Sequence, residues 1–353
     1  MLNRSDFEKL PAWYDTLKSC GLPIYIYGMG NGCEKVLAAF EEQGITPAGI
    51  FTSDDFKRDR EFHGYRLKTL SQLEAECDSF AVVCAFGTSL PEIMQRIEYL
   101  AERHLLVYPE MSVAGESYFK KDELLSRFEN AQRVYGLLED EKSRTTFDSE
   151  LKFKVTGDIG YLKEYSEPSE AFENILKLGN DEIYADLGAY NGDTVSEFIS
   201  HTNGYRHIYA MEPSRRNFSK CVRNCLGLDN ITLINAAASD SDRVTFFSDG
   251  AGRQQAISET GTPVSARSLD SILKGTECTY IKYDVEGEDI PAILGSRKTI
   301  EKYRPKLRTG IYHRPMDIID IPLLINSVVP EYRLFMRRPR YYPAWDLELF
   351  AVI

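Results

Sequence analysis

Ionisable residues gather at the ends of two apolar segments in the second half of the chain. The run YIKYDVEGED brings Lys282, Asp284 and Glu286 at every second position, and His313 ends a later apolar segment, KLRTGIYH. On an extended strand, residues at every second position point to one side. Such groups are costly to gather beside apolar residues without a function, so all four are predicted to be catalytic.

These residue types suit the removal of a proton from a bound hydroxyl. An imidazole titrates near neutral pH, so His313 is the expected general base. Asp284 or Glu286 then orients His313 or takes the role itself. Two alternatives stay open: a buried structural histidine, and a divalent metal on Asp284 and Glu286, which is not favoured because no further hard ligand is fixed by spacing.

A glycine-containing loop earlier in the chain predicts a ligand cradle. The run EIYADLGAYNGDT reads as a strand over 183–186, a tight loop, and a helix whose start is indicated by Thr194 and Glu197 at the capping-box spacing. Acids before and after the loop oppose a diphosphate, whereas S-adenosylmethionine carries an ammonium and a sulfonium that they attract. The residues predicted to hold this cofactor are Asp186, Gly188, Ala189, Tyr190, Asn191, Gly192, Asp193, Thr194 and, from the later site, Asp284.

Two further segment ends complete the predicted cofactor site. Glu212 ends the run HIYAMEP, where a carboxylate can accept hydrogen bonds from both ribose hydroxyls. The alternative is an acid that caps the following helix. Asn235 and Ala236 end the run ITLIN and its continuation, where an amide and a small residue can frame an adenine edge.

The elements that must position these residues alternate between apolar strands and amphipathic helices, which predicts α/β architecture. We expect strands at 183–186, 207–211, 231–235, 280–284 and 306–312, followed by a terminal pair at 332–337 and 347–352. The first part of the chain predicts a smaller parallel-sheet domain with strands at 23–27, 48–51, 80–86 and 104–108. The expected domains are a Rossmann-like domain at 1–113, a helical connector at 114–174 and a second Rossmann-like domain at 175–353.

The N-terminal strand runs into Gly28-Met29-Gly30-Asn31-Gly32-Cys33, which invites a dinucleotide interpretation. Cys33 occupies the third glycine position, which normally allows a close contact between helix and strand. Asp54 or Asp55 stands where a ribose-binding acid is expected. A turn that needs glycine only for its backbone is the main alternative; a nucleotide or nucleotide-sugar is the expected ligand if this domain binds one.

Several motifs together resemble the FkbM family of S-adenosylmethionine-dependent methyltransferases: DLGAYNGDT, the acid of MEP, SLDSI at 268–272, IKYDVEGED and IYHRPMDIIDIP. The resemblance covers residues 175–353 and implies the class I methyltransferase fold. It also implies O-methyl transfer to the hydroxyl of a sugar or another natural product. It places the 186–193 loop at the methionine end of the cofactor, Glu212 at the ribose, and the DVEG acids with His313 at the acceptor.

Composition limits the partners. The net charge of −12 opposes nucleic acid, and no apolar run reaches the roughly 20 residues that span a bilayer. The seven cysteines lie apart in apolar segments, and the first residues do not read as a signal peptide, so we expect a cytoplasmic protein with reduced thiols. Rival functions are an NAD-dependent oxidoreductase, a non-catalytic nucleotide-binding protein, and an enzyme that methylates a nitrogen or a carboxyl group; a homo-oligomer is possible.

Overall fold

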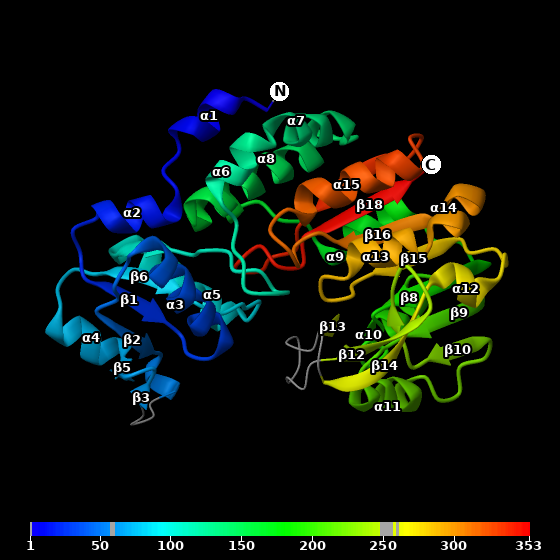
Figure 1. Ribbon diagram of the computed structural model, residues 1–353, viewed down its shortest axis with the longest axis horizontal. Helices are drawn as coiled ribbons and strands as arrows, with labels where there is room; N and C mark the ends of the chain where they lie inside the picture. The colour runs from blue at the N-terminus through cyan, green and yellow to red at the C-terminus, as the bar shows by residue number, and fades with distance from the viewer. Residues whose placement is uncertain (1, 57–60, 248–256, 259–260) are drawn as a thin grey trace. The chain divides into compact units, whose positions relative to one another are not determined.

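The computed structural model describes residues 2–56, 61–247, 257–258 and 261–353 (Figure 1). Within them the chain divides into two compact units. Unit 1 comprises residues 1–135, 145–165 and 338–345, and unit 2 comprises 136–144, 166–337 and 346–353. Each unit therefore contains a short segment that is distant in sequence from the rest of it.

Unit 1 is built on a five-stranded parallel sheet in the order β5-β2-β1-β6-β7. Side chains of β1 alternate between two apolar clusters, Tyr25 and Tyr27 in one and Ile24 and Ile26 in the other, so both faces of the sheet are covered. Its strands are β1 (Ile24–Tyr27), β2 (Gly49–Thr52), β5 (Lys68–Thr69), β6 (Ala81–Cys84), β7 (Leu105–Val107) and a separate pair, β3 (Glu61–Phe62) and β4 (Tyr65–Arg66). Its first helices are α1 (Arg4–Lys9), α2 (Trp13–Ser19), α3 (Asn31–Gln43), α4 (Leu70–Glu76) and α5 (Pro91–Arg103), with a 3-10 turn at Asp54–Phe56.

Three helices follow where the sequence predicts a helical connector: α6 (Lys121–Ser126), α7 (Phe128–Leu137) and α8 (Glu141–Thr156). The chain passes between the two units within α7 and within α8. Most of α8 belongs to unit 1, where Lys154 forms a buried ion pair with Glu110 at 2.5 Å. A 3-10 turn (Ile159–Leu162), α9 (Pro168–Ala171) and a π turn (Phe172–Leu176) lead into unit 2.

Unit 2 contains a seven-stranded sheet in the order β10-β9-β8-β15-β16-β18-β17. The first five strands in this order run parallel, and β18 pairs antiparallel with both β16 and β17. This is the predicted arrangement of five parallel strands and a terminal hairpin, and the bounds agree with the expected ranges to within two residues. They are β8 (Glu182–Leu187), β9 (Tyr205–Met211), β10 (Ile231–Ile234), β15 (Tyr280–Tyr283), β16 (Lys306–Gly310), β17 (Arg333–Arg337) and β18 (Glu348–Val352).

Helices pack on both faces of this sheet (Figure 1). Helices α10 (Asp193–Ser200) and α11 (Arg215–Asn224) share one apolar cluster with the strands. The other group consists of α12 (Leu269–Leu273), α13 (Asp289–Leu294), α14 (Arg297–Tyr303) and α15 (Asp317–Val328). A small second sheet combines β11 (Ala237–Ala238), β12 (Arg243–Phe247), β13 (Ile257–Ser258) and β14 (Thr262–Arg267).

One local prediction is wrong. The helix after the glycine loop does not begin with a Thr194–Glu197 capping box: its N-cap is Gly192, and no side chain caps it. Thr194 instead donates to Asp186, and Glu197 pairs with Arg308 at 2.7 Å. Among the described residues, no helix combines the length and apolar character that crossing a membrane requires.

Candidate functional site

A buried ion pair links the two central strands of unit 2. Strands β8 and β15 are paired so that Asp186 lies opposite Lys282. The Lys282 ammonium lies 3.3 Å from Asp186 Oδ1 and also donates to the carbonyl of Gly188 at 3.1 Å. Burial opposes the charge of Lys282, but Asp186 and Asp284 outweigh it and raise the pKa of Lys282 above its usual value. Lys282 therefore stays protonated and cannot act as a base at neutral pH.

The glycine loop folds tightly over this pair. Gly188 has φ +95°, and a Cβ there would lie 2.0 Å from the carbonyl oxygen of Asp284. The amides of Gly188 and Ala189 both donate to the carbonyl of Met211, at 3.0 and 2.8 Å. The backbone thus ties the carboxyl ends of β8, β9 and β15 together, which is where α/β sheets bind ligands.

The rest of the loop turns outward before α10 begins. Gly192 has φ +87°, and a Cβ there would approach Cys225 Sγ to 3.2 Å. Tyr190, also with positive φ, is 44% exposed and lies under the Lys220 ammonium. The Asn191 side chain accepts from the amide of Asp193 at 3.0 Å, which closes the turn locally.

Glu212 lies just after β9 and is 7% exposed. One carboxylate oxygen accepts from the amide of Tyr190 at 3.0 Å and the other from the amide of Ser214 at 2.8 Å. Burial raises the pKa of Glu212 to about 7, although these amides favour the charged form. Each oxygen keeps acceptor capacity, so the group can bind a pair of hydroxyls.

Asn235 supports Glu212 from the next strand end. Its amide nitrogen donates to the carbonyls of Glu212 and Pro213, at 2.8 and 3.0 Å. Ala236 is buried beside it. The amide nitrogen is thus engaged with the backbone that carries Glu212, and the side-chain carbonyl is the part of Asn235 that remains for a ligand.

The acid–base residues meet at the carboxyl ends of β15 and β16. His313, in the loop after β16, is 0% exposed; its Nε2 lies 3.1 Å from Asp284 Oδ1 and 3.9 Å from Glu286 Oε2. The Tyr312 hydroxyl lies 3.4 Å from the same Asp284 oxygen. Asp284 Oδ2 lies 3.7 Å from the Lys282 ammonium, so Lys282 joins this group to Asp186. Asp284 and Glu286 have side chains 40% and 33% exposed, and they can face an acceptor.

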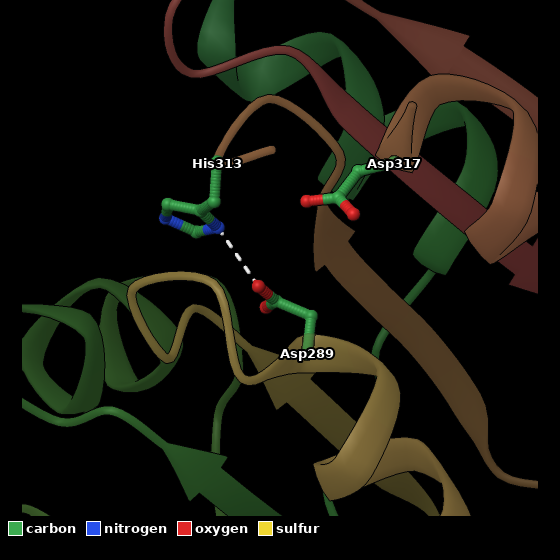
Figure 2. Close-up of side chains that lie close together, drawn as sticks. All are labelled: Asp289, His313 and Asp317. Atoms are coloured by element: carbon green, nitrogen blue, oxygen red, sulfur yellow. Dashed lines mark hydrogen bonds and ion pairs between the residues drawn. The ribbon is translucent and has the colours of Figure 1, made fainter. Parts of the chain in front are cut away.

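Two acids that the sequence analysis did not select lie behind His313. Figure 2 shows Asp289 and Asp317 beside the imidazole, with Asp289 Oδ2 2.8 Å from Nδ1. Burial lowers the pKa of an imidazole, but Asp289 and Asp284 outweigh it and raise the pKa of His313 well above its usual value. The two acids therefore favour the imidazolium form of His313. This opposes its expected role as general base and favours the alternative in which Asp284 or Glu286 takes the proton.

Asp289, His313 and Asp317 each offer a ligand atom, and these atoms all lie within 4.8 Å of one another, close enough to hold one metal ion. All three are buried, and an Asp289 oxygen already binds His313 Nδ1. Burial and the Asp289 carboxylate raise the pKa of Asp317 to about 7. Protons on His313 and Asp317 can therefore balance the charge of the group.

The glycine loop of unit 1 has the backbone of a strand–turn–helix junction. Gly28 and Gly30 have positive φ, and a Cβ on Gly32 would lie 2.0 Å from the Ala85 carbonyl. Gly32 thus provides the close approach that the sequence pattern assigned to the position of Cys33. Of the two acids expected at the ribose, Asp54 binds the Ser71 hydroxyl at 2.8 Å. Asp55 pairs with Arg96 at 3.1 Å.

The sheet order of unit 2, with β18 antiparallel to its neighbours, is that of the class I methyltransferase fold. Residues 186–341 match the sequence model of the methyltransferase FkbM domain. This part of the chain is therefore similar to FkbM methyltransferase domains, as the motifs indicated.

A solved structure agrees on the fold. The methyltransferase FkbM of Methylobacillus flagellatus is 18% identical, with a TM-score of 0.75 over 99% of this chain and 96% of that one. An rRNA methylase from Streptococcus thermophilus is 14% identical, with a TM-score of 0.36 over 53% and 96% of the two chains. A putative methyltransferase from Streptococcus mutans, solved with SAH, is 14% identical, with a TM-score of 0.35 over 53% and 98%. No curated protein matches the chain.

Proposed function

We propose that the protein transfers a methyl group from S-adenosylmethionine to a hydroxyl of a small molecule, such as a sugar or another natural product. One observation carries the proposal: the Lys282 ammonium lies within 4 Å of both Asp186, on the cofactor side, and Asp284, on the acceptor side. A cofactor held at the first acid and an acceptor held at the second would therefore be neighbours.

The donor set fits this cofactor. Two carboxylates, Asp186 and Glu212, stand at adjacent strand ends, and the amides of the 188–190 loop are turned toward the protein's own acceptors. Because these amides already donate within the protein, few of them could bind a diphosphate. An ammonium, a sulfonium and two ribose hydroxyls need acceptors and negative charge, and these the site supplies.

The cofactor supplies an electrophilic methyl group. The chain's own residues have two tasks: to hold the acceptor oxygen in line with that methyl, and to take its proton. Asp284 and Glu286 are the groups for the second task because both are partly exposed carboxylates beside the buried pair. As the new bond from oxygen to carbon forms, the bond from carbon to sulfur breaks with its electrons going to sulfur, and the hydroxyl proton passes to the carboxylate.

Calorimetric titration with S-adenosylhomocysteine, the demethylated product, tests the cofactor assignment. Wild type is expected to bind it, and Glu212→Ala is expected to bind it about tenfold or more weakly, because a buried acceptor pair is lost. Glu197→Gln is the matched control, since that acid lies in the same unit but pairs with Arg308. Equal affinity in wild type and Glu212→Ala would remove the ribose assignment.

The same titration with NAD(H) tests the oxidoreductase alternative, which depends on the glycine loop of unit 1. Turnover is then measured with labelled S-adenosylmethionine over a panel of sugars, other alcohols and amines. Transfer to amines alone would replace the hydroxyl acceptor by a nitrogen. Binding of S-adenosylhomocysteine without transfer to any acceptor would favour the non-catalytic alternative.

A further inference from the structure

We infer that Asp289 and Asp317 are positioning residues of this site, which fix the His313 imidazole so that its Nε2 addresses the acceptor-facing carboxylates of Asp284 and Glu286. The inference rests on the proposed function and deepens it. It assigns a task to two buried acids that the cofactor and the acceptor do not use directly.

The first contact fixes the ring. Asp289 begins α13, His313 lies in the loop after β16, and their side chains are 1% and 0% exposed. Asp289 Oδ2 accepts from His313 Nδ1 at 2.8 Å. A buried imidazole whose Nδ1 is held by a carboxylate presents Nε2 in one direction.

The second acid holds the loop that carries the ring. Asp317 begins α15, is 4% exposed, and accepts from the amide of Arg314 at 2.8 Å. Its carboxylate also lies within 4.8 Å of the ligand atoms of Asp289 and His313 (Figure 2). This hydrogen bond therefore fixes the loop at the residue that follows His313. Acids from two helices, α13 and α15, surround the imidazole.

The other side of the ring meets the acceptor-facing groups. Nε2 lies 3.1 Å from Asp284 Oδ1 and 3.9 Å from Glu286 Oε2. Glu286 has φ +52°, a left-handed backbone that is unusual for this residue and is common in functional turns. The Asp284 carboxylate thus lies between two cations, the imidazolium at Oδ1 and the Lys282 ammonium at Oδ2, and their charges orient it toward the acceptor hydroxyl.

The alternative is a buried histidine that only stabilises the fold. The two roles differ in what a change at Asp289 does to the imidazole and to turnover. The charged and titratable groups around His313 come from four segments: Lys282, Asp284 and Glu286 at the end of β15, Asp289 in α13, Tyr312 and Arg314 in the loop, and Asp317 in α15.

The test combines Asp289→Asn and Asp317→Asn with NMR of nitrogen-labelled histidine in the full-length protein, His313→Gln providing the assignment. In wild type, both ring nitrogens of His313 are expected to stay protonated above pH 7. In Asp289→Asn its pKa is expected to fall toward the ordinary value of about 6.5. The turnover number is expected to fall about 100-fold with a shifted pH profile, while the affinity for S-adenosylhomocysteine stays within about twofold. Asp289→Glu should recover part of the turnover.

Asp270→Asn is the matched control, because that acid caps α14 through the amides of Lys298 and Thr299 and lies outside the group. It should lower the melting temperature without moving the His313 titration or the pH profile. The NMR titration needs no turnover, so it tests the contact between Asp289 and His313 even if wild type transfers no methyl group. The turnover number and its pH profile then separate a positioning role from one that only stabilises the fold. An unchanged His313 titration in Asp289→Asn overturns the inference, and so does a turnover number that Asp289→Asn leaves unchanged.

Discussion

Asp186 and Lys282 form an ion pair across neighbouring strands, with Lys282 Nζ 3.3 Å from Asp186 Oδ1 and neither side chain more than 4% exposed. Each of these buried charges is stabilised by the other, because either alone would carry a large desolvation penalty. The pair thus belongs to the core of unit 2 and also forms part of the proposed cofactor site. Changes here test structure and function together.

Lys282→Met is expected to lower the free energy of unfolding by about 3 kcal/mol, because Asp186 is left as an uncompensated buried charge. Adding Asp186→Asn should restore part of the loss, since the double variant buries no net charge. Urea unfolding of the two single variants and the double variant measures the coupling. Additive losses would show that the two residues do not stabilise each other.

The affinity for S-adenosylhomocysteine is expected to rise with pH between about 6 and 8. The pKa of Glu212 is raised to about 7 in the free protein, and ribose hydroxyls donate best to its carboxylate form. Below that pKa the protein must release a proton on binding, so affinity should fall by up to about tenfold per pH unit. The same raised pKa makes the folded state less stable as pH rises from the ordinary carboxyl value to 7.

Glu212→Gln provides the control for this pH dependence. It keeps the shape and an acceptor oxygen but removes the titration, so its affinity should be weaker and flat across the same range. Calorimetry in buffers of different ionisation enthalpy counts the protons released. A wild-type affinity that does not change with pH would contradict the ribose assignment of Glu212.

Gly188→Ala is expected to abolish cofactor binding and to destabilise unit 2 by several kcal/mol. The new Cβ would lie 2.0 Å from the Asp284 carbonyl, and the residue has φ +95°, so both space and backbone oppose it. Gly227→Ala is the matched control: it also has positive φ, but no atom lies within 4 Å of its Cβ, so it should cost only about 1 kcal/mol. Thermal unfolding measures the loss of stability, and calorimetry measures the loss of cofactor binding.

The strands, and the grouping of Lys282, Asp284 and His313, followed from short-range patterns in the sequence. Alternation placed Lys282 and Asp284 on one side of β15, and the order of elements brought His313 to the neighbouring strand end. The failures came from partners far away in the chain. Thr194 and Glu197 have the local spacing of a capping box, but Asp186 and Arg308 bind them instead.

Asp289 and Asp317 escaped sequence reasoning for a related reason. Each stands in the first turn of a helix, where an acid is ordinary because it interacts favourably with the helix dipole. Their placement on His313 depends on how α13 and α15 pack beside the sheet, which no local pattern reports. The pKa of His313, on which the proposed choice of general base rests, depends on the same packing.

A buried arginine connects the segment 136–144 to the rest of unit 2. Arg337, on β17, is 6% exposed and donates to Asp140 at 2.6 Å, Ser143 at 2.9 Å and Glu170 at 2.9 Å. Burial opposes the charge of Asp140, but the hydrogen bonds from Arg337 and Ser143 outweigh it and lower the pKa of Asp140 to about 2. A lowered carboxyl pKa contributes stability above the ordinary pKa of the group, and this stability is lost as pH falls toward 2.

Arg337→Met is therefore expected to lower the free energy of unfolding at pH 7 by about 2 kcal/mol, since Asp140 is partly exposed and water compensates some of the loss. The difference from wild type should shrink below pH 4, where Asp140 becomes protonated in the variant. Arg333→Met is the control on the same strand, because that arginine is 52% exposed and pairs with Glu139 at 3.2 Å. It should change stability by less than about 0.5 kcal/mol at any pH. Equal losses in the two variants would show that the buried network adds nothing beyond an exposed ion pair.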